Sequence, residues 1–158
     1  MATLLRTDSS QPDFQALVRW LDDELHIRDG EDHAFYAQFN KIDLIRHAIV
    51  AYVDEVAVGC GAYKLYGQDG VEIKRMFVRP EFRGQRIAEQ VLTELESWAR
   101  EIGATSCVLE TGLKQPEAIR LYQRCGYERI PNYGQYEGIE NSICLQKQLS
   151  LTTVISEK

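Results

Sequence analysis

The chain has 158 residues, 44% of them hydrophobic and 27% charged, a balance typical of a globular protein that buries a core. This length fits one domain and is too short for two independent ones, so we expect a single domain over residues 1–158. The net charge of −6 argues against nucleic acid as a partner, because it would repel a phosphate backbone. We find neither a signal peptide nor an apolar run long enough to span a membrane, so we expect a cytoplasmic protein without a membrane partner.

The first third of the chain predicts a strand followed by a helix. Ala2 to Arg6 is a short apolar run typical of a strand, and the polar cluster Thr7 to Ser10 offers helix N-caps. Ala34 to Phe39 fits either a second helix or an ordered loop. Apolar residues at helical spacing predict one amphipathic helix: Phe14, Leu17, Val18, Leu21 and Leu25.

Three antiparallel strands follow. Ala48 to Val53 and Val56 to Leu65 are rich in β-branched and aromatic residues, and Asp54-Glu55 between them is a hairpin signal. Gly67 to Gly70 predicts a second turn before the strand Val71 to Val78.

The rest of the chain predicts a crossover and a final strand. An apolar stripe marks a helix from Ala88 to Ile102, Ser106 to Glu110 is a short strand, and Pro116 begins a helix that runs to Cys125. Ile139 to Leu149 supplies the last strand, and a position at a sheet edge would favour a homodimer. We therefore expect an α/β (α+β) fold with a mixed, mostly antiparallel sheet and helices on both faces.

The most informative segment is the junction between Val78 and Ala88. It reads as a strand end, a tight turn and a helix start, and the free N–H groups of a helix N-terminus form a site for a phosphate anion. Gly84 lets a phosphate approach the backbone closely, and Arg83 and Arg86 add positive charge. Taken alone, such a junction also fits an ordinary turn.

Two motifs resemble the GNAT superfamily of N-acetyltransferases. Arg83-Gly84-Gln85-Arg86-Ile87-Ala88 resembles the acetyl-coenzyme A loop, whose pattern is Arg or Gln, two free positions, Gly, one free position, then Gly or Ala. Arg83 and Ala88 match this pattern, whereas Arg86 replaces the central Gly. Further on, Ala118 to Tyr127 is similar to the family's "A, I, x, L, Y, x, x, x, G, F" helix, and the resemblance runs from about Val56 to Leu149.

The resemblance implies a GNAT-like fold and transfer of an acetyl group from acetyl-coenzyme A, the donor substrate, to the amine of a small molecule or peptide. It assigns the pyrophosphate to the backbone at positions 83 to 88: Arg83, Gly84, Gln85, Arg86, Ile87 and Ala88. Backbone N–H groups of Met76, Phe77 and Val78 would hold the pantetheine arm, and a bulge there would leave such donors unpaired. Gln115 stands where the family often has Asn, so its amide either binds the cofactor or caps the next helix.

Acetyl transfer needs a base, because freeing the lone pair of an amine of pKa about 10.4 at pH 7 costs about 4.6 kcal/mol. Glu72 is the candidate, since the family often has a glutamate here that acts directly or through water. An exposed strand residue paired with Lys64 or Lys74 is an equally good interpretation of Glu72.

The departing thiolate benefits from a proton, and Tyr122 occupies the tyrosine position of the family helix. The alternative for Tyr122 is a core residue beside Ala118, Ile119 and Cys125. In the loop Asn132 to Asn141, three residues are candidates to line the acceptor pocket: Tyr133, Tyr136 and Glu137.

Other side chains fit plain structural roles. Cys60, Cys107, Cys125 and Cys144 lie far apart without a C-x-x-C pair, so we expect reduced thiols and no metal. Trp20 fits a helix face. Acidic clusters such as Asp22 to Glu24 either are solvated faces or attract a cationic amine.

Two other functions compete with this assignment. One is a coenzyme A-binding sensor or interaction module without catalysis, against which the presence of both Glu72 and Tyr122 argues. The other is an acyltransferase that uses a different acyl donor or a hydroxyl acceptor.

Overall fold

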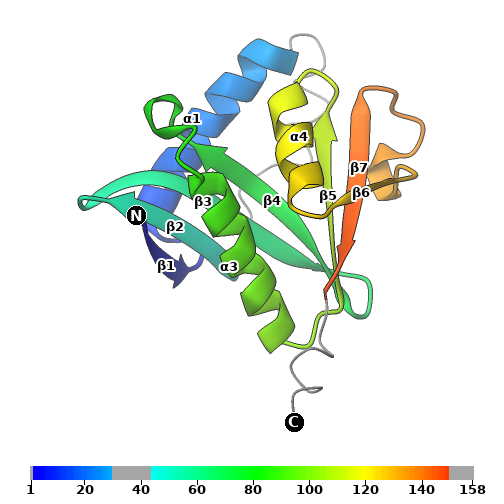
Figure 1. Cartoon of the computed structure of the whole chain (residues 1–158), viewed down its shortest axis with the longest axis horizontal. Coiled ribbons are helices and arrows are strands. Elements are labelled where there is room, and N and C mark those ends of the chain that lie inside the picture. Colours follow the sequence, from blue (N-terminus) through cyan, green and yellow to red (C-terminus); the bar gives the residue numbers. More distant parts are fainter. Residues whose placement is uncertain (1, 30–43, 150–158) are drawn as a thin grey trace. The chain divides into compact units, whose positions relative to one another are not determined.

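The computed structural model (Figure 1) describes residues 2–29 and 44–149, without the side chains of residues 26 to 29. The chain divides into two compact units. Unit 1 comprises Met1–Lys64 and Lys74–Leu95, and unit 2 comprises Leu65–Ile73 and Glu96–Lys158. Residues Ala34 to Phe39, expected as a helix or loop, lie outside the described part. The single domain expected from the length stays a prediction.

Seven strands form one sheet in the order β1-β2-β3-β4-β5-β7-β6. β4 and β5 are parallel, and the pairs β1–β2, β2–β3, β5–β7 and β6–β7 are antiparallel, which confirms the mixed, mostly antiparallel sheet. The strands are β1 (Thr3–Thr7), β2 (His47–Val53), β3 (Val56–Tyr66), β4 (Gly70–Val78), β5 (Ser106–Gly112), β6 (Glu128–Ile130) and β7 (Ser142–Gln148).

Three α-helices and two short 3₁₀ segments complete the described chain: α1 (Pro12–Asp29), α3 (Ile87–Glu101), α4 (Pro116–Arg124), η2 (Pro80–Phe82) and η3 (Gly134–Tyr136). None of these helices is long and apolar enough to cross a membrane, as far as the described residues go.

In unit 1, α1 covers one face of β2 and β3. The helix starts with Pro12, and the side chain of Gln11 accepts the N–H of Phe14 at 2.8 Å, so this cap comes from Gln11 and not from the cluster Thr7 to Ser10. The predicted stripe faces the sheet in a cluster of buried residues: Phe14, Leu17, Val18, Leu21, Ile45, Ala48, Val50, Cys60, Ala62 and Phe77.

The N-terminal half of α3 covers the other face of the same strands. Gly61 alternates with the α1-facing Cys60 and Ala62, and a Cβ at Gly61 would lie 2.5 Å from the Met76 sulfur and 2.8 Å from Val91. Gly61 therefore allows α3 to pack closely on β3. Helices on both faces of the sheet are confirmed within this unit.

In unit 2, β7 lies between β5 and β6. Ser106 to Gly112 pair with Gln148 to Ser142, and Glu128 to Ile130 pair with the other side of β7. The sequence prediction missed β6 because its three residues carry no apolar alternation, and it began β7 three residues early. β7 is thus not an edge strand, which removes the argument for a homodimer based on it; the homodimer itself stays a prediction.

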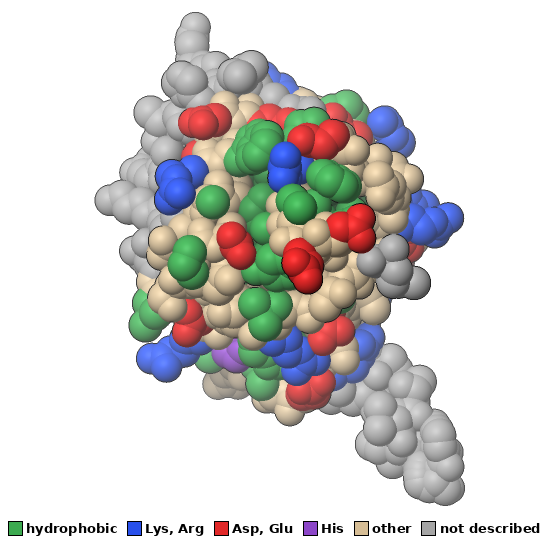
Figure 2. Space-filling view, turned by 90° about the vertical axis from the view of Figure 1, so that its left-hand side faces the viewer, with side chains coloured by type: hydrophobic (Ala, Val, Ile, Leu, Met, Phe, Trp, Pro, Cys, Tyr) green, Lys and Arg blue, Asp and Glu red, His purple; other side chains and the backbone are tan. Residues whose placement is uncertain are grey.

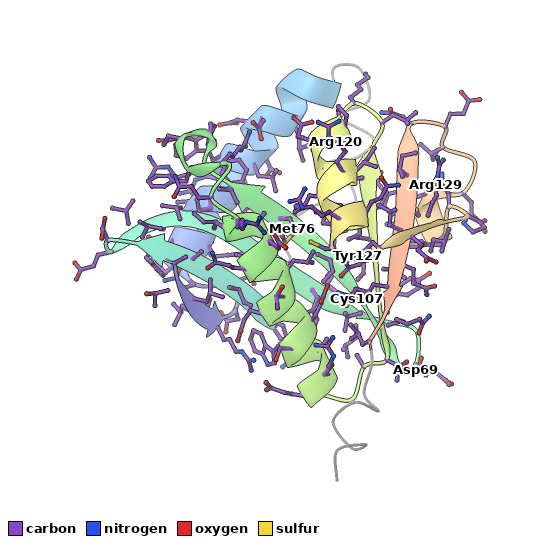
Figure 3. All side chains as sticks on the ribbon, viewed as in Figure 1. Asp69, Met76, Cys107, Arg120, Tyr127 and Arg129 are labelled. Atoms are coloured by element: carbon purple, nitrogen blue, oxygen red, sulfur yellow. The ribbon has the colours of Figure 1, made fainter. Side chains whose placement is uncertain are left out.

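A buried charged group ties three elements of unit 2 together. Glu96 on α3 is 3% exposed, and its carboxylate accepts hydrogen bonds from the Tyr127 hydroxyl at 2.8 Å and from Lys147 of β7 at 2.9 Å. Cys107 on β5 lies beside Tyr127 (Figure 3). Removing Lys147 would leave the buried Glu96 carboxylate without its counter-charge at a cost of about 3–5 kcal/mol, so this ion pair holds the end of α3 against β7 within unit 2.

Non-glycine residues with positive φ mark two turns of unit 1. Asp54 and Glu55 have φ of 50° and 68°, as a type I′ hairpin turn requires. Before α3, Gly84 has φ 84° and Arg86 has φ 67°. Arg86 thus adopts the left-handed conformation that costs a residue with a Cβ about 1–2 kcal/mol.

We expect Arg86→Gly to raise the free energy of unfolding by about 0.5–1 kcal/mol, because relief of the left-handed strain exceeds the added chain entropy of glycine. Arg86→Ala is the control: it keeps the strain and loses the same exposed side chain and its 3.5 Å contact with Glu89. Urea unfolding with unchanged m-values measures the difference. Equal midpoints for the Gly and Ala variants would show that no strain is held at this position.

Candidate active site

The segment between β4 and α3 has the backbone geometry of an anion site. β4 ends at Val78, the N–H of Arg79 is bonded to the Val58 carbonyl at 2.8 Å, and η2 follows directly. Gly84 and Arg86 then turn the chain into α3, a helix of 15 residues whose first N–H groups have no acceptor within the helix. A Cβ at Gly84 would meet nothing within 4 Å, so the space beside it is open. The loop fits a phosphate bound by backbone N–H groups.

Arg83 is held by protein groups. Its Nε donates to the Val78 carbonyl at 2.8 Å, and its terminal nitrogen donates to both carboxylate oxygens of Glu24 at 3.0 and 3.1 Å. The guanidinium thus connects the end of β4 to α1 inside unit 1. These hydrogen bonds explain how Arg83 shapes the loop. A direct contact between Arg83 and a phosphate stays a prediction.

The other predicted loop residues differ in exposure. The Arg86 side chain is 78% exposed and lies near Glu89, while Ile87 is buried and anchors the start of α3. Gln85 is exposed and Ala88 is half-buried. The backbone of this segment, more than its charges, is what the structure offers to an anion.

An aromatic contact beside the loop was not predicted. The Arg79 guanidinium lies 4.8 Å from the ring centre of Trp20 and 5.6 Å from that of Phe82, and it pairs with Glu81 at 2.8 Å. Trp20 was interpreted only as a helix-face residue. Together with the Glu24–Arg83 pair, this contact braces the loop against α1, and only the positions of Arg79 and Arg83 near the motif hint at it in the sequence.

β4 itself is irregular where the pantetheine arm was expected. Its ladder with β5 covers Gly70 to Glu72, although β4 continues to Val78. Arg75 has φ 63°, a left-handed conformation within a strand, and fits the irregularity that was expected there. Of the three predicted pantetheine residues, Met76 is half-buried, and Phe77 and Val78 are 4% and 7% exposed, so contacts there would have to involve the backbone.

Glu72 meets a partner that neither interpretation foresaw. The hydroxyl of Tyr133 donates to its Oε2 atom at 2.8 Å, within unit 2. The side chain is half-buried. Burial and the adjacent negative charge of Glu72 raise the pKa of Tyr133 above its usual range, so this phenol stays protonated and donates.

Tyr122 is the buried residue of α4, 7% exposed, and its ring meets Tyr127 edge-on at 5.9 Å. Burial raises the pKa of Tyr122 above that of a free phenol, with smaller contributions from Cys125 and Glu110. Burial also raises the pKa of Tyr136, with contributions from Glu110 and then Glu72. The charges of Glu72 and Glu110 and the hydroxyls of the tyrosines therefore act on one another within unit 2.

Gln115 occupies the N-cap position of α4, as one interpretation expected, but its side chain makes no capping hydrogen bond. Its amide nitrogen lies 3.8 Å from where a Cβ on Gly112 would stand, at the end of β5. The cofactor interpretation of the amide stays a prediction.

The loop between β6 and β7 carries the residues suggested for the acceptor. An open pocket of about 730 Å³ lies on this part of unit 2, next to Arg129 of β6 (Figure 3). Glu137 lines it, but Glu72, Tyr122, Tyr133 and Tyr136 do not. Its lining is Arg129, Ile130, Pro131, Asn132, Glu137, Gly138, Ile139, Glu140 and Ser142.

In the described part of the chain, neither surface charge nor metal-ligating side chains indicate a further site. On the face in Figure 2, acidic side chains are interspersed with Lys and Arg, which favours the solvated-face interpretation there. No group of three or more metal-ligating side chains occurs among the described residues. Burial raises the pKa of the Cys60 and Cys107 thiols to about 12, in line with reduced, unreactive thiols.

Comparison with known proteins gives relatives with acetyltransferase names. Residues 14–127 match the model of the "Acetyltransferase (GNAT) family". The IAA acetyltransferase of Azospirillum brasilense is 36% identical over 102 residues, 64% of this chain and 67% of the relative. The aminoalkylphosphonate N-acetyltransferase of Salmonella typhimurium is 41% identical over 58 residues, 37% of this chain and 38% of that protein. These alignments leave about a third or more of each relative unmatched.

Solved structures agree in fold. A Klebsiella pneumoniae protein assigned as an acyl-CoA N-acyltransferase has a TM-score of 0.80 at 28% identity, covering 95% of this chain and 99% of that one. A GNAT family acetyltransferase from Elizabethkingia anophelis with acetyl-CoA bound has a TM-score of 0.65 at 18% identity, covering 94% and 98% of the two chains. With a family match over most of its length and the loop geometry described above, the chain belongs to the acetyltransferase (GNAT) family of N-acetyltransferases.

Proposed function

We propose that the protein transfers an acetyl group from acetyl-coenzyme A to the primary amine of a small molecule or peptide, directly and in a ternary complex. The observation that carries the proposal is the left-handed turn at Gly84 and Arg86, which presents the N-terminus of α3 as an anion site after the strand that bears Glu72. Backbone N–H groups from Gly84 to Ala88 would bind the pyrophosphate, and those of Met76 to Val78 the pantetheine arm.

Direct transfer is supported by the state of the thiols. A mechanism through an acetylated enzyme needs an activated nucleophile, and a cysteine serves as one when it is a thiolate. Cys60 and Cys107 are held as thiols by burial, and burial also raises the pKa of Cys144. Direct attack of the amine on the thioester needs no such nucleophile.

Glu72 would take the proton of the acceptor amine. As a carboxylate it would bind the ammonium of the acceptor and take one proton from it, and the neutral nitrogen then attacks the thioester carbonyl. Its half-buried position in unit 2 strengthens this interaction relative to a fully solvated carboxylate.

Tyr122 would assist the leaving sulfur. Because burial raises the pKa of this phenol, its hydroxyl remains protonated at neutral pH. Thiols are stronger acids than a buried phenol, with a reference pKa of about 8.5 for cysteine, so complete proton transfer to a free thiolate is uphill. The hydroxyl therefore contributes a hydrogen bond that strengthens as negative charge develops on the sulfur.

The name of one relative supports an amine acceptor without selecting one. It is the aminoalkylphosphonate N-acetyltransferase, a protein that this chain matches only in part. We therefore propose the reaction type and the donor, and leave the acceptor at the level of a primary amine.

Acetyl-coenzyme A should raise the melting temperature at concentrations well above its dissociation constant, because it binds the native state alone.

Gly84→Asp should weaken binding at least tenfold by placing a carboxylate where phosphate oxygens sit. The matched control is Gly84→Asn, which has the same shape and left-handed strain without the charge. Isothermal calorimetry measures the three affinities, and equal affinities for Asp and Asn would show that no anion binds at this turn.

A panel of primary amines should support release of free thiol from acetyl-coenzyme A, with an acetylated amine detected by mass spectrometry. Double-reciprocal plots of the initial rate against donor concentration, at several acceptor concentrations, should give intersecting lines, as sequential addition of both substrates requires. Parallel lines would indicate an acetyl-enzyme and contradict direct transfer. Binding of the donor without thiol release for any amine would favour the non-catalytic module.

Tyr122→Phe should lower turnover by about 10²- to 10³-fold while donor affinity and stability change little, because only the hydroxyl that donates to the developing thiolate is lost. Tyr127→Phe is the control, since it removes another buried hydroxyl of unit 2 that binds Glu96. The control should cost about 1–3 kcal/mol of stability and retain chemistry. If Tyr122→Phe keeps at least half the parent rate when chemistry is rate-limiting, Tyr122 is a packing residue.

A further inference from the structure

Three tyrosines of unit 2 pack against one another next to Glu72. Tyr66 comes from the end of β3, and Tyr133 and Tyr136 come from the loop between β6 and β7. The Tyr133 ring lies 5.1 Å from the Tyr66 ring, tilted by 57°, and 5.7 Å from the Tyr136 ring, with the planes at 89°. Tyr136 is 2% exposed and anchors this part of the loop. The Tyr133 ring is therefore held from two sides.

The backbone around Tyr133 is also held. Its carbonyl accepts the N–H of Tyr136 at 2.9 Å, and its backbone is hydrogen-bonded to the thiol of Cys144 on β7. Next to it, the Asn132 side chain donates to the Ile139 carbonyl at 3.0 Å, which closes the loop on itself. Both the ring and the main chain thus define where the Tyr133 hydroxyl points.

We propose that Tyr133 is a positioning residue for the reaction: its hydroxyl holds Oε2 of Glu72, so that Oε1 is the oxygen that faces the amine and takes its proton. The 2.8 Å bond between the two side chains is the observation that carries this role. The inference rests on the proposed function, because it needs Glu72 to act as the base.

The bond would restrict the rotation of a flexible glutamate, which removes part of the entropy cost of aligning the base with the amine. Other ionisable groups that act in this region come from β5, the loop, β7 and β6: Glu110, Tyr136, Cys144 and Arg129.

The test is a double-mutant cycle with Tyr133→Phe and Glu72→Gln, followed by thiol release. Tyr133→Phe keeps both ring contacts and should lower kcat by about 10- to 100-fold, the factor typical of a hydrogen bond to a charged group. In the Glu72→Gln background the same substitution should change kcat less than twofold.

A second measurement does not depend on turnover. In protein labelled with ¹³C at the glutamate carboxyls, the Glu72 signal is identified by its loss in Glu72→Gln, and its chemical shift at pH 7 should change in Tyr133→Phe because the hydrogen bond to Oε2 is lost. Tyr66→Phe is the matched control, because it removes a tyrosine hydroxyl from the same cluster and should leave the Glu72 chemical shift in place.

The outcomes separate the two proposals. If Glu72→Gln strongly lowers activity but Tyr133→Phe leaves the Glu72 carboxyl signal unchanged, or lowers kcat equally in both backgrounds, the positioning role is overturned and the base remains. Full activity of Glu72→Gln overturns the base assignment and the role of Tyr133 with it.

Discussion

The proposed donor site depends on the irregular end of β4. From Gly70 to Glu72 the strand pairs with β5 in a regular parallel ladder, whereas further along Arg75 bends the backbone with a positive φ. In the proposed function, backbone groups of Met76 to Val78 after this bend would bind the amide-rich arm of the acyl donor.

In the loop from Arg83 to Ala88, side-chain contacts maintain a conformation that the backbone alone disfavours. A glycine at position 86 would adopt the left-handed turn without strain, and here an arginine does so with φ 67°. The surrounding contacts hold the turn in place: Ile87 is buried, Arg83 joins Val78 to Glu24, and Arg79 stacks on Trp20. Because the side chain of Arg86 points into solvent, the N–H groups remain available to an anion.

Local sequence patterns predicted most helices and strands, but they could not predict contacts between residues far apart in the sequence. The apolar stripe of α3 and the turn at Asp54-Glu55 depend on neighbouring residues and were found in the sequence. β6 has three residues without alternation and was missed. The bond between Glu72 and Tyr133 joins residues 61 positions apart, and the pair of Glu24 and Arg83 joins residues 59 apart. No local periodicity reports such pairs, so motif positions identified candidate residues but not their partners.

The contact between Glu72 and Tyr133 also bears on the proposed chemistry. A fixed orientation makes the remaining oxygen of a carboxylate more effective in proton transfer. This matters when the acceptor arrives as an ammonium, because the carboxylate must be correctly aligned to deprotonate it. Since Tyr133 lies on a loop between two strands, changes in that loop would alter the choice of acceptor while the proposed donor site on β4 and α3 stays the same.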